Sequence, residues 1–314
     1  MKSRPNILLI QADQLTSQVL SMYGNKMAIT PNIKALADRG VTFLNSYCNN
    51  PVCGPSRASM ITGQLSSAVG CYDNAGEFLS SVPTFAHYLR DLNYKTCLSG
   101  KMHFVGADQL HGFEERLTTD IYPSDFGWTA DWTQQDEPYA PSRMSLRSIV
   151  EAGICKRSLQ IDYDEDVCYQ AVQKIYDYAR DKNSKPFMLM ASFTHPHNPF
   201  VTTKEFWDLY NHSDIEMPKV PWSPISSRDP WSQRYALTIR EDEHNVSESD
   251  LRNARHAYLG MVSYFDSLIG RIVHSLKECD FYENTYIFVV ADHGEMLGER
   301  GTWFKFLPFE WSVR

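Results

Sequence analysis

Short apolar runs alternate along this chain with helical patterns, and this alternation restricts the possible folds more than any other feature. The apolar runs predict strands at residues 6–12, 41–47, 95–99, 187–193 and 286–290. Between them, amphipathic patterns predict helices at residues 31–39, 56–62, 82–92, 164–180 and 247–279. Strands that alternate with helices form mainly parallel sheets with helices on both faces. The sequence therefore predicts an α/β fold with a mainly parallel sheet sandwiched by helices.

Polar side chains follow four of the predicted strands, at the point where each strand ends. They are Asp13, Lys101 with His103, His197, and Asp292 with His293. Ligands of parallel α/β sheets bind beyond the carboxyl ends of the strands. We therefore expect these residues to meet at one edge of the sheet and to form a polar functional site there.

Charge and hydropathy restrict the partners of such a site. The chain has 30 Lys and Arg residues against 38 Asp and Glu residues, a formal net charge of −8, and no basic run. It repels nucleic acid on average, so we expect no nucleic-acid partner. No stretch approaches the roughly 18 apolar residues that a bilayer requires, so we expect no membrane partner.

The predicted compartment is the cytoplasm. The apolar run at residues 7–10 is too short for the core of a secretion signal. The seven cysteines lack the paired spacing of metal motifs, and their odd number fits a reducing compartment better than a disulfide framework. A homo-oligomer is compatible with these features.

The sharpest motif is Cys53-Gly-Pro-Ser-Arg57, followed by Thr62-Gly63. It resembles the signature of type I sulfatases of the alkaline phosphatase superfamily, in which a formylglycine-generating enzyme oxidises the cysteine to an aldehyde. A serine sulfate ester would be hard to hydrolyse. The hydrated aldehyde instead has a second hydroxyl, which expels sulfate. Arg57, one helical turn after Cys53, is expected to hold the hydroxyl oxygens and offset charge.

The same resemblance implies a divalent metal held by Asp13, Cys53, Asp292 and His293. Hard oxygen ligands favour Ca²⁺, which we expect, or Mg²⁺; the imidazole of His293 also admits Mn²⁺. Family members commonly carry two aspartates after the first strand. Gln14 stands at the second of these positions, which leaves one carboxylate fewer.

The remaining catalytic residues are implied by position in the family pattern. Lys101 and Lys305 resemble the two sulfate-binding lysines, and His103 resembles the histidine that hydrogen-bonds the aldehyde hydrate. His197, in a His-Asn-Pro context, resembles the histidine that contacts sulfate and protonates the leaving oxygen. His195 lies two residues earlier on the same segment, but it lacks that context.

Longer stretches resemble the choline-sulfatase branch of the family, at residues 11–16, 72–77, 100–106, 109–116 and 125–132. This resemblance covers nearly the whole chain and implies hydrolysis of choline O-sulfate to choline and sulfate. Aromatic rings bind a quaternary ammonium, and a desolvated cation–π contact contributes about 2 kcal/mol. Asn74 and Trp128 match positions of the substrate pocket; further candidates are Asp73, Tyr122, Asp125 and Trp132.

Two alternatives stay open at this point. A phosphonate monoester or phosphodiester hydrolase of the same superfamily shares the formylglycine signature. Family members also continue well beyond the position of Lys305, into further core strands and a smaller C-terminal sheet. We therefore expect residues 1–314 to be a sulfatase catalytic domain without its C-terminal subdomain, and an inactive fragment is the second alternative.

Overall fold

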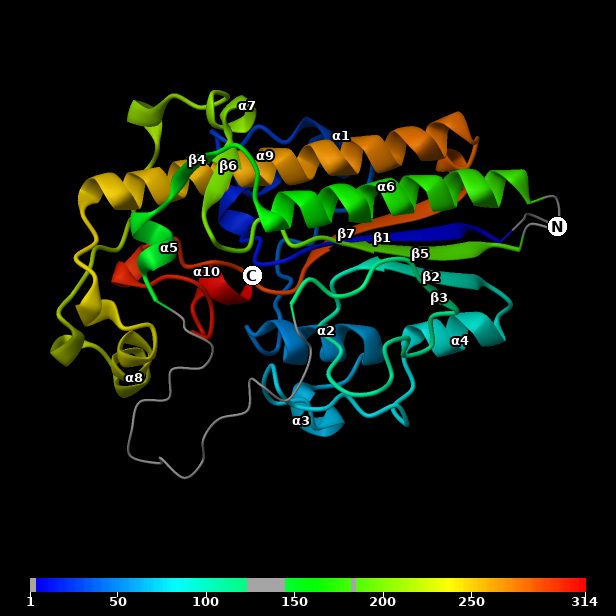
Figure 1. Ribbon diagram of the computed structural model, residues 1–314, viewed down its shortest axis with the longest axis horizontal. Coiled ribbons are helices and arrows are strands. Elements are labelled where there is room, and N and C mark those ends of the chain that lie inside the picture. Colours follow the sequence, from blue (N-terminus) through cyan, green and yellow to red (C-terminus); the bar gives the residue numbers. More distant parts are fainter. Residues whose placement is uncertain (1–3, 123–144, 182–184) are drawn as a thin grey trace.

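The computed structural model describes residues 4–122, 145–181 and 185–314, and its centre is a parallel sheet (Figure 1). The strands of this sheet are β1 (Asn6–Ala12), β2 (Lys95–Gly100), β3 (Glu115–Arg116), β5 (Phe187–Ser192) and β7 (Thr285–Ala291). Their order is β3-β2-β5-β1-β7, and every pairing is parallel. A small second sheet pairs β4 (Gly153–Cys155) with β6 (Val201–Thr203).

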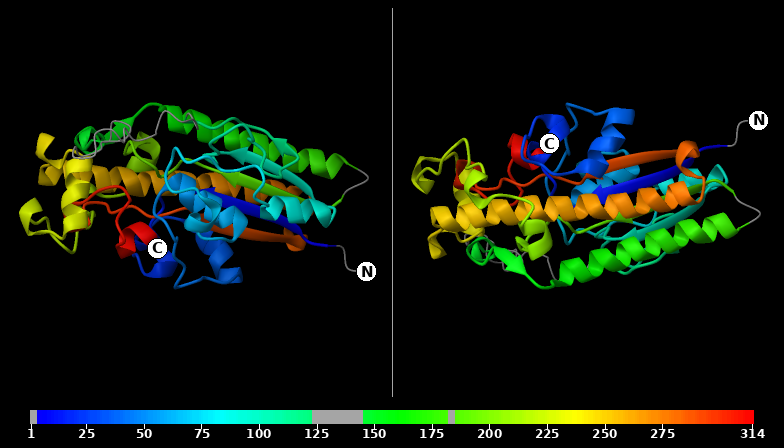
Figure 2. Two further views of the ribbon diagram at one scale, coloured as in Figure 1. Left: turned by 90° about the horizontal axis from the view of Figure 1, so that it is seen from below. Right: turned by 90° about the horizontal axis from the view of Figure 1, so that it is seen from above.

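Helices cover both faces of the sheet (Figures 1 and 2). One face carries α1 (Pro31–Arg39), α6 (Leu159–Arg180) and α9 (Glu248–Glu278), and the other carries α2 (Cys53–Thr62), α3 (Ser66–Val69) and α4 (Phe85–Asp91). The remaining helices are short: α5 (Arg147–Val150), α7 (Lys204–Trp207), α8 (Pro230–Thr238) and α10 (Glu310–Val313). The predicted layered arrangement is confirmed.

The two long helices on the first face begin at clear sequence signals. The Ser247 hydroxyl accepts from the Asp250 amide, and the Asp250 carboxylate accepts from the Ser247 amide, which forms a capping box at the start of α9. The Ser158 hydroxyl accepts from the Ile161 amide at the start of α6. Each helix buries an apolar stripe in the core, so both are fixed relative to the strands. In the described part of the chain, no helix has the length and apolar character needed to cross a bilayer.

The prediction of a strand at residues 41–47 is wrong. This segment has no regular structure, and it exposes 79% of Val41 and 69% of Phe43. Apolar and β-branched residues favour a strand only where a neighbouring strand pairs with their backbone. No strand pairs with this segment in the described residues. The predicted helices at 56–62 and 164–180 are real, but they begin earlier, at Cys53 and Leu159.

His111 is a buried histidine on the α4 side of the sheet. Its ring lies against Phe78 and Phe104, with ring centroids 4.2 Å and 4.4 Å away. Neither ring nitrogen has a hydrogen-bond partner among the described residues, and the Asp108 carboxylate lies 3.6 Å from Nδ1. Burial outweighs the attraction of that carboxylate and lowers the pKa of His111 from 6.5 to about 4.

Protonation of His111 should make the stability of the protein depend on pH. The unfolded chain binds this proton near pH 6.5 and the folded chain only near pH 4, so stability is lost as pH falls through that window. Lowering the pH from about 7 to about 5 should therefore reduce the free energy of unfolding of His111→Gln by about 1–2 kcal/mol less than that of wild type. Urea unfolding at both pH values measures this difference. Equal losses in the two proteins would contradict the prediction.

Candidate active site

The carboxyl ends of four neighbouring strands bring the site together. β1 lies between β5 and β7, and its backbone pairing continues one step past the strands. The Asp292 amide donates to the Ala12 carbonyl, and the Asp13 amide donates to the His195 carbonyl, both at 3.3 Å. Asp13, Asp292 and the loop that carries His197 therefore leave the sheet at one place. Lys101 follows β2 at the same edge.

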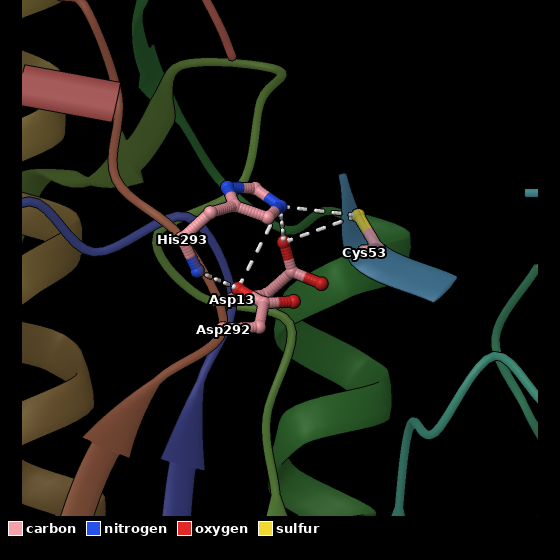
Figure 3. Close-up of side chains that lie close together, drawn as sticks. All are labelled: Asp13, Cys53, Asp292 and His293. Atoms are coloured by element: carbon pink, nitrogen blue, oxygen red, sulfur yellow. Dashed lines mark hydrogen bonds and ion pairs between the residues drawn. The ribbon is translucent and has the colours of Figure 1, made fainter. Parts of the chain in front are cut away.

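Four of the predicted ligands form one buried cluster (Figure 3). The ligand atoms of Asp13, Cys53, Asp292 and His293 all lie within 4.8 Å of one another. His293 Nε2 is 3.3 Å from Cys53 Sγ, 3.6 Å from Asp292 Oδ1 and 3.8 Å from Asp13 Oδ1. These residues belong to three separate segments of the sequence, and the fold brings them together.

The cluster has the features of a divalent-metal site. His293 Nδ1 lies 3.0 Å from the carbonyl oxygen of Gly294, so Nδ1 carries the proton and Nε2 faces the carboxylates. Metal-binding histidines are commonly held by such a bond. Burial alone would lower the pKa of His293, but Asp292 and Cys53 raise it. The surroundings therefore favour positive charge here, and the two carboxylates supply the oxygen ligands that hard cations prefer.

Gln14 replaces the second aspartate of the family pattern, and its side chain has other partners. Its Oε1 accepts from Lys305 Nζ at 2.5 Å, and its Nε2 donates to Glu295 Oε2 at 2.5 Å. Burial raises the pKa of Glu295 to about 7. The Gln14 amide oxygen is thus occupied by Lys305, and Gln14 links Glu295 to that lysine.

Arg57 is fully buried between the two carboxylates of the cluster. Its Nε donates to Asp292 Oδ2 at 2.8 Å and its Nη2 to Asp13 Oδ2 at 2.9 Å. Its Nη1 donates to Ser192 Oγ at 2.8 Å and to the Lys101 carbonyl at 2.5 Å. Burial would lower the pKa of Arg57, but Asp292 and Asp13 raise it. The guanidinium therefore pairs with both acidic side chains and holds them in place.

Lys101 adds a second positive charge beside the cluster. Its Nζ lies 2.6 Å from Asp13 Oδ2 and 4.8 Å from the centre of the Tyr122 ring. Burial would raise the pKa of Asp13, but Lys101, His197, Arg57 and Lys305 hold it well below its usual value. Asp13 therefore stays a carboxylate although it is fully buried.

Cys53 is the first residue of helix α2, so it lies at the N-terminal end of that helix. Such a helix end favours negative charge. Burial and Asp13 would raise the pKa of the Cys53 thiol, but Lys101 and Lys305 lower it. The site is therefore built to hold an anion next to this residue.

His197 and Lys305 form a close pair although they are far apart in the sequence. Lys305 Nζ lies 2.6 Å from His197 Nε2, and His197 Nδ1 lies 2.7 Å from the carbonyl of Asn198. An ammonium group can only donate, so Nε2 accepts from Lys305 and Nδ1–H donates to Asn198. Burial and the charge of Lys305 hold the pKa of His197 well below its usual value. His197 is therefore a neutral ring whose Nε2 accepts a hydrogen bond from Lys305.

His103 and Asn74 lie next to the start of α2. Asn74 Oδ1 accepts from the Gly54 amide at 2.9 Å, and the Asn74 carbonyl lies 3.0 Å from His103 Nε2. His103 Nδ1 is buried without a hydrogen-bond partner in the described residues. Burial and Lys101 lower the pKa of His103 to about 4. His103 is thus a neutral ring with an available acceptor nitrogen.

Three of the substrate-binding candidates, Trp128 together with Asp125 and Trp132, lie outside the described residues. Tyr122 is at the site, because its ring contacts Lys101 and lies 5.9 Å from the ring of His197. From the sequence, Tyr122 was only a further candidate.

Sequence reasoning missed several buried polar residues that hold the site. Gln160 and Asp164 of α6, Asp120 after β3, and Glu295 after β7 all hydrogen-bond to site segments. Glu295 follows His293 by two residues, and that spacing was the available signal. Gln160 and Asp164 carried none, because polar residues on a helix normally face solvent.

Comparison with known proteins agrees with this geometry. The family model described as "Sulfatase" matches residues 5–312. A protein named choline-sulfatase from Rhizobium meliloti (strain 1021) is 45% identical over 314 residues, which cover 99% of this chain and 61% of that protein. An arylsulfatase from Clostridium perfringens (strain 13 / Type A) is 29% identical and is matched over 99% of this chain and 67% of its own length. The chain thus spans 61% of the choline-sulfatase that it resembles.

Solved structures share the fold. The phosphonate monoester hydrolase of Agrobacterium radiobacter matches with a TM-score of 0.76 and 21% identity, over 99% of this chain and 66% of that one. The structure of BT4656 in complex with its substrate D-glucosamine-2-N,6-O-disulfate matches with a TM-score of 0.72 and 24% identity, over 99% and 70%. At these identities the likeness concerns the fold alone.

Proposed function

Because the chain belongs to the sulfatase family, we propose that it hydrolyses a sulfate ester, with choline O-sulfate as the substrate. The 45% identity to a choline-sulfatase over nearly the whole chain supports the choline ester. The observation that carries the proposal is the convergence of Cys53, two carboxylates and three buried cations at one sheet edge.

Two groups complete the site in this proposal. Cys53 is converted to formylglycine by a formylglycine-generating enzyme, so its sulfur atom stands where an oxygen of the hydrated aldehyde would be. Asp13, Asp292, His293 and the side chain at residue 53 would hold a divalent cation, with Ca²⁺ as the first choice and Mg²⁺ or Mn²⁺ as alternatives. When bound, the aldehyde hydrate supplies a nucleophilic hydroxyl and the cation supplies positive charge for sulfate oxygens.

The side chains of this chain provide the remaining chemistry. Lys101 and Lys305 attract the sulfate group, while Arg57 holds the side chains of Asp13 and Asp292 in place. The Lys305–His197 pair protonates the departing choline oxygen, because an alkoxide is a poor leaving group. The available Nδ1 of His103 accepts the proton that a reacting hydroxyl must lose.

The free thiols of all seven cysteines, each within the described residues, support a reducing compartment such as the cytoplasm.

A substrate comparison tests the proposal. Choline O-sulfate should be cleaved with a kcat/KM at least about tenfold above that of a phosphonate monoester or phosphodiester. The neutral carbon isostere, 3,3-dimethylbutyl sulfate, should lose about 30-fold in kcat/KM, equivalent to the roughly 2 kcal/mol of a desolvated cation–π contact. Faster cleavage of the phosphonate would favour the alternative hydrolase. Equal kcat/KM for choline O-sulfate and its isostere would show that the protein does not recognise the ammonium group.

A further inference from the structure

One carboxylate on helix α6 fixes the beginning of the loop that carries His197. Asp164 is fully buried. Its two oxygens accept from the Thr194 amide (2.8 Å), the Thr194 hydroxyl (3.0 Å), the His195 amide (2.9 Å) and His195 Nδ1 (2.7 Å). An ionised carboxylate has about four acceptor positions, so these partners use its full capacity. The backbone is therefore held at the two residues that follow Phe193.

A second polar residue on the same helix fixes the end of this loop. Gln160 lies four residues before Asp164, on the same face of α6. Its Nε2 donates to the Asn198 carbonyl at 2.8 Å and to Tyr122 Oη at 2.7 Å. The Asn198 carbonyl is also the acceptor for His197 Nδ1. Gln160 thus holds the Asn198 carbonyl, which orients the His197 ring, and the ring of Tyr122, which lies beside the His197 ring.

We propose that Asp164 and Gln160 are positioning residues that hold His197 Nε2 opposite Lys305 Nζ, where the pair protonates the leaving oxygen. This inference rests on the proposed function. The hydrogen bonds of both side chains go to the His197 loop and to Tyr122, and not to the four residues of the metal cluster. Their effect reaches the reaction through the loop, whose two ends they hold.

Replacing Asp164 with asparagine tests whether this side chain positions the loop by its hydrogen bonds or only fills a buried space. The variant Asp164→Asn keeps the volume of the side chain, but its amide nitrogen meets N–H or O–H donors where a carboxylate oxygen accepted them. The loop must shift to relieve that contact. A misplacement of about 1 Å costs on the order of 10²-fold in rate when the group acts in the reaction.

The test compares two sulfate esters that differ in their need for a proton. Choline O-sulfate releases an alkoxide, which must be protonated, whereas 4-nitrophenyl sulfate releases a phenolate that leaves without a proton. Asp164→Asn should lower kcat for choline O-sulfate by about 100-fold with little change in KM. It should lower kcat for 4-nitrophenyl sulfate by less than about fivefold. A merely structural residue would lower both rates by the same factor.

Two further variants complete the design. Gln160→Met keeps the side-chain length without its hydrogen bonds, and it should lower the choline O-sulfate rate selectively by about tenfold. If Asp164→Asn does not fold, the two rates of Gln160→Met test whether α6 positions the His197 loop. Asp166→Asn changes an exposed carboxylate of the same helix and should leave both rates unchanged.

Each result has one meaning. Selective loss on the alkyl ester supports positioning by α6. Equal loss on both esters, or no loss on either, overturns it while the proposed function stands. A wild-type protein that cleaves neither ester refutes the proposed function itself, and the positioning role with it.

Discussion

Replacing Cys53 with alanine should lower kcat for choline O-sulfate by about 10⁴-fold or more, the scale at which loss of a nucleophile acts in other hydrolases. Cys53 lies at the start of α2 and in the cluster with Asp13, Asp292 and His293. No other side chain in the cluster provides a hydroxyl or thiol, so the variant has no substitute nucleophile. Steady-state hydrolysis of choline O-sulfate measures the loss.

The serine variant separates the formylglycine scheme from simple nucleophilic attack. A serine hydroxyl can accept sulfate once, but the resulting ester has no second hydroxyl that expels it. With 4-nitrophenyl sulfate as the substrate, Cys53→Ser should therefore release at most one equivalent of 4-nitrophenol per protein molecule and then stop. Cys155→Ser, at a partly exposed cysteine outside the site, should keep wild-type turnover.

The mass of the peptide that contains Cys53 gives an independent measurement. Conversion of the thiol to the aldehyde lowers that mass by about 18 Da, and the nucleophile requires this conversion. Full turnover by Cys53→Ser, or an unmodified cysteine in a fully active preparation, would rule out the proposed chemistry.

Arg57→Met should destabilise the protein by about 3–5 kcal/mol, because it leaves two buried carboxylates without their partner. The side chains of Arg57, Asp13 and Asp292 are all 0% exposed, and the two ion pairs measure 2.9 Å and 2.8 Å. Methionine fills a similar volume, so the loss reports charge and hydrogen bonds more than packing. Urea unfolding measures the change in free energy.

A matched variant defines the reference for Arg57. Arg147 pairs with Glu151, but their side chains are 73% and 58% exposed. Arg147→Met should change the unfolding free energy by no more than about 0.5 kcal/mol. If Arg57→Met were as stable as Arg147→Met, the carboxylates would not depend on the guanidinium, and the electrostatic account of the site would be wrong.

Arg57 also shows where a sequence motif identifies a residue but not all of its partners. The motif identified Arg57 one helical turn after Cys53, and we expected it to hold the hydroxyl oxygens. In the structure its donors contact Asp13, Asp292, Ser192 and the Lys101 carbonyl. These contacts come in addition to the predicted role toward the hydroxyl oxygens, which stays a prediction. Partners distant in the sequence are set by packing, which a motif does not encode.

The sequence by itself predicted four of the five strands of the main sheet, the edge where the site lies, and most of the residues at that edge. This was possible because the period of apolar residues is local and the carboxyl ends of parallel strands meet at one place. The segment at residues 41–47 shows the limit of this reasoning, since its pattern favours a strand but no partner strand in the described residues lies beside it.

Only the tertiary structure decided how the site is held. Three interactions at the site join segments that are distant in the sequence. Lys305 contacts His197 and also Gln14. Gln160 and Asp164 support the His197 loop. A buried polar residue on a helix has the same local pattern as one that faces solvent. Its role depends on which donors the packed elements bring against it, and that information exists only once the chain has folded.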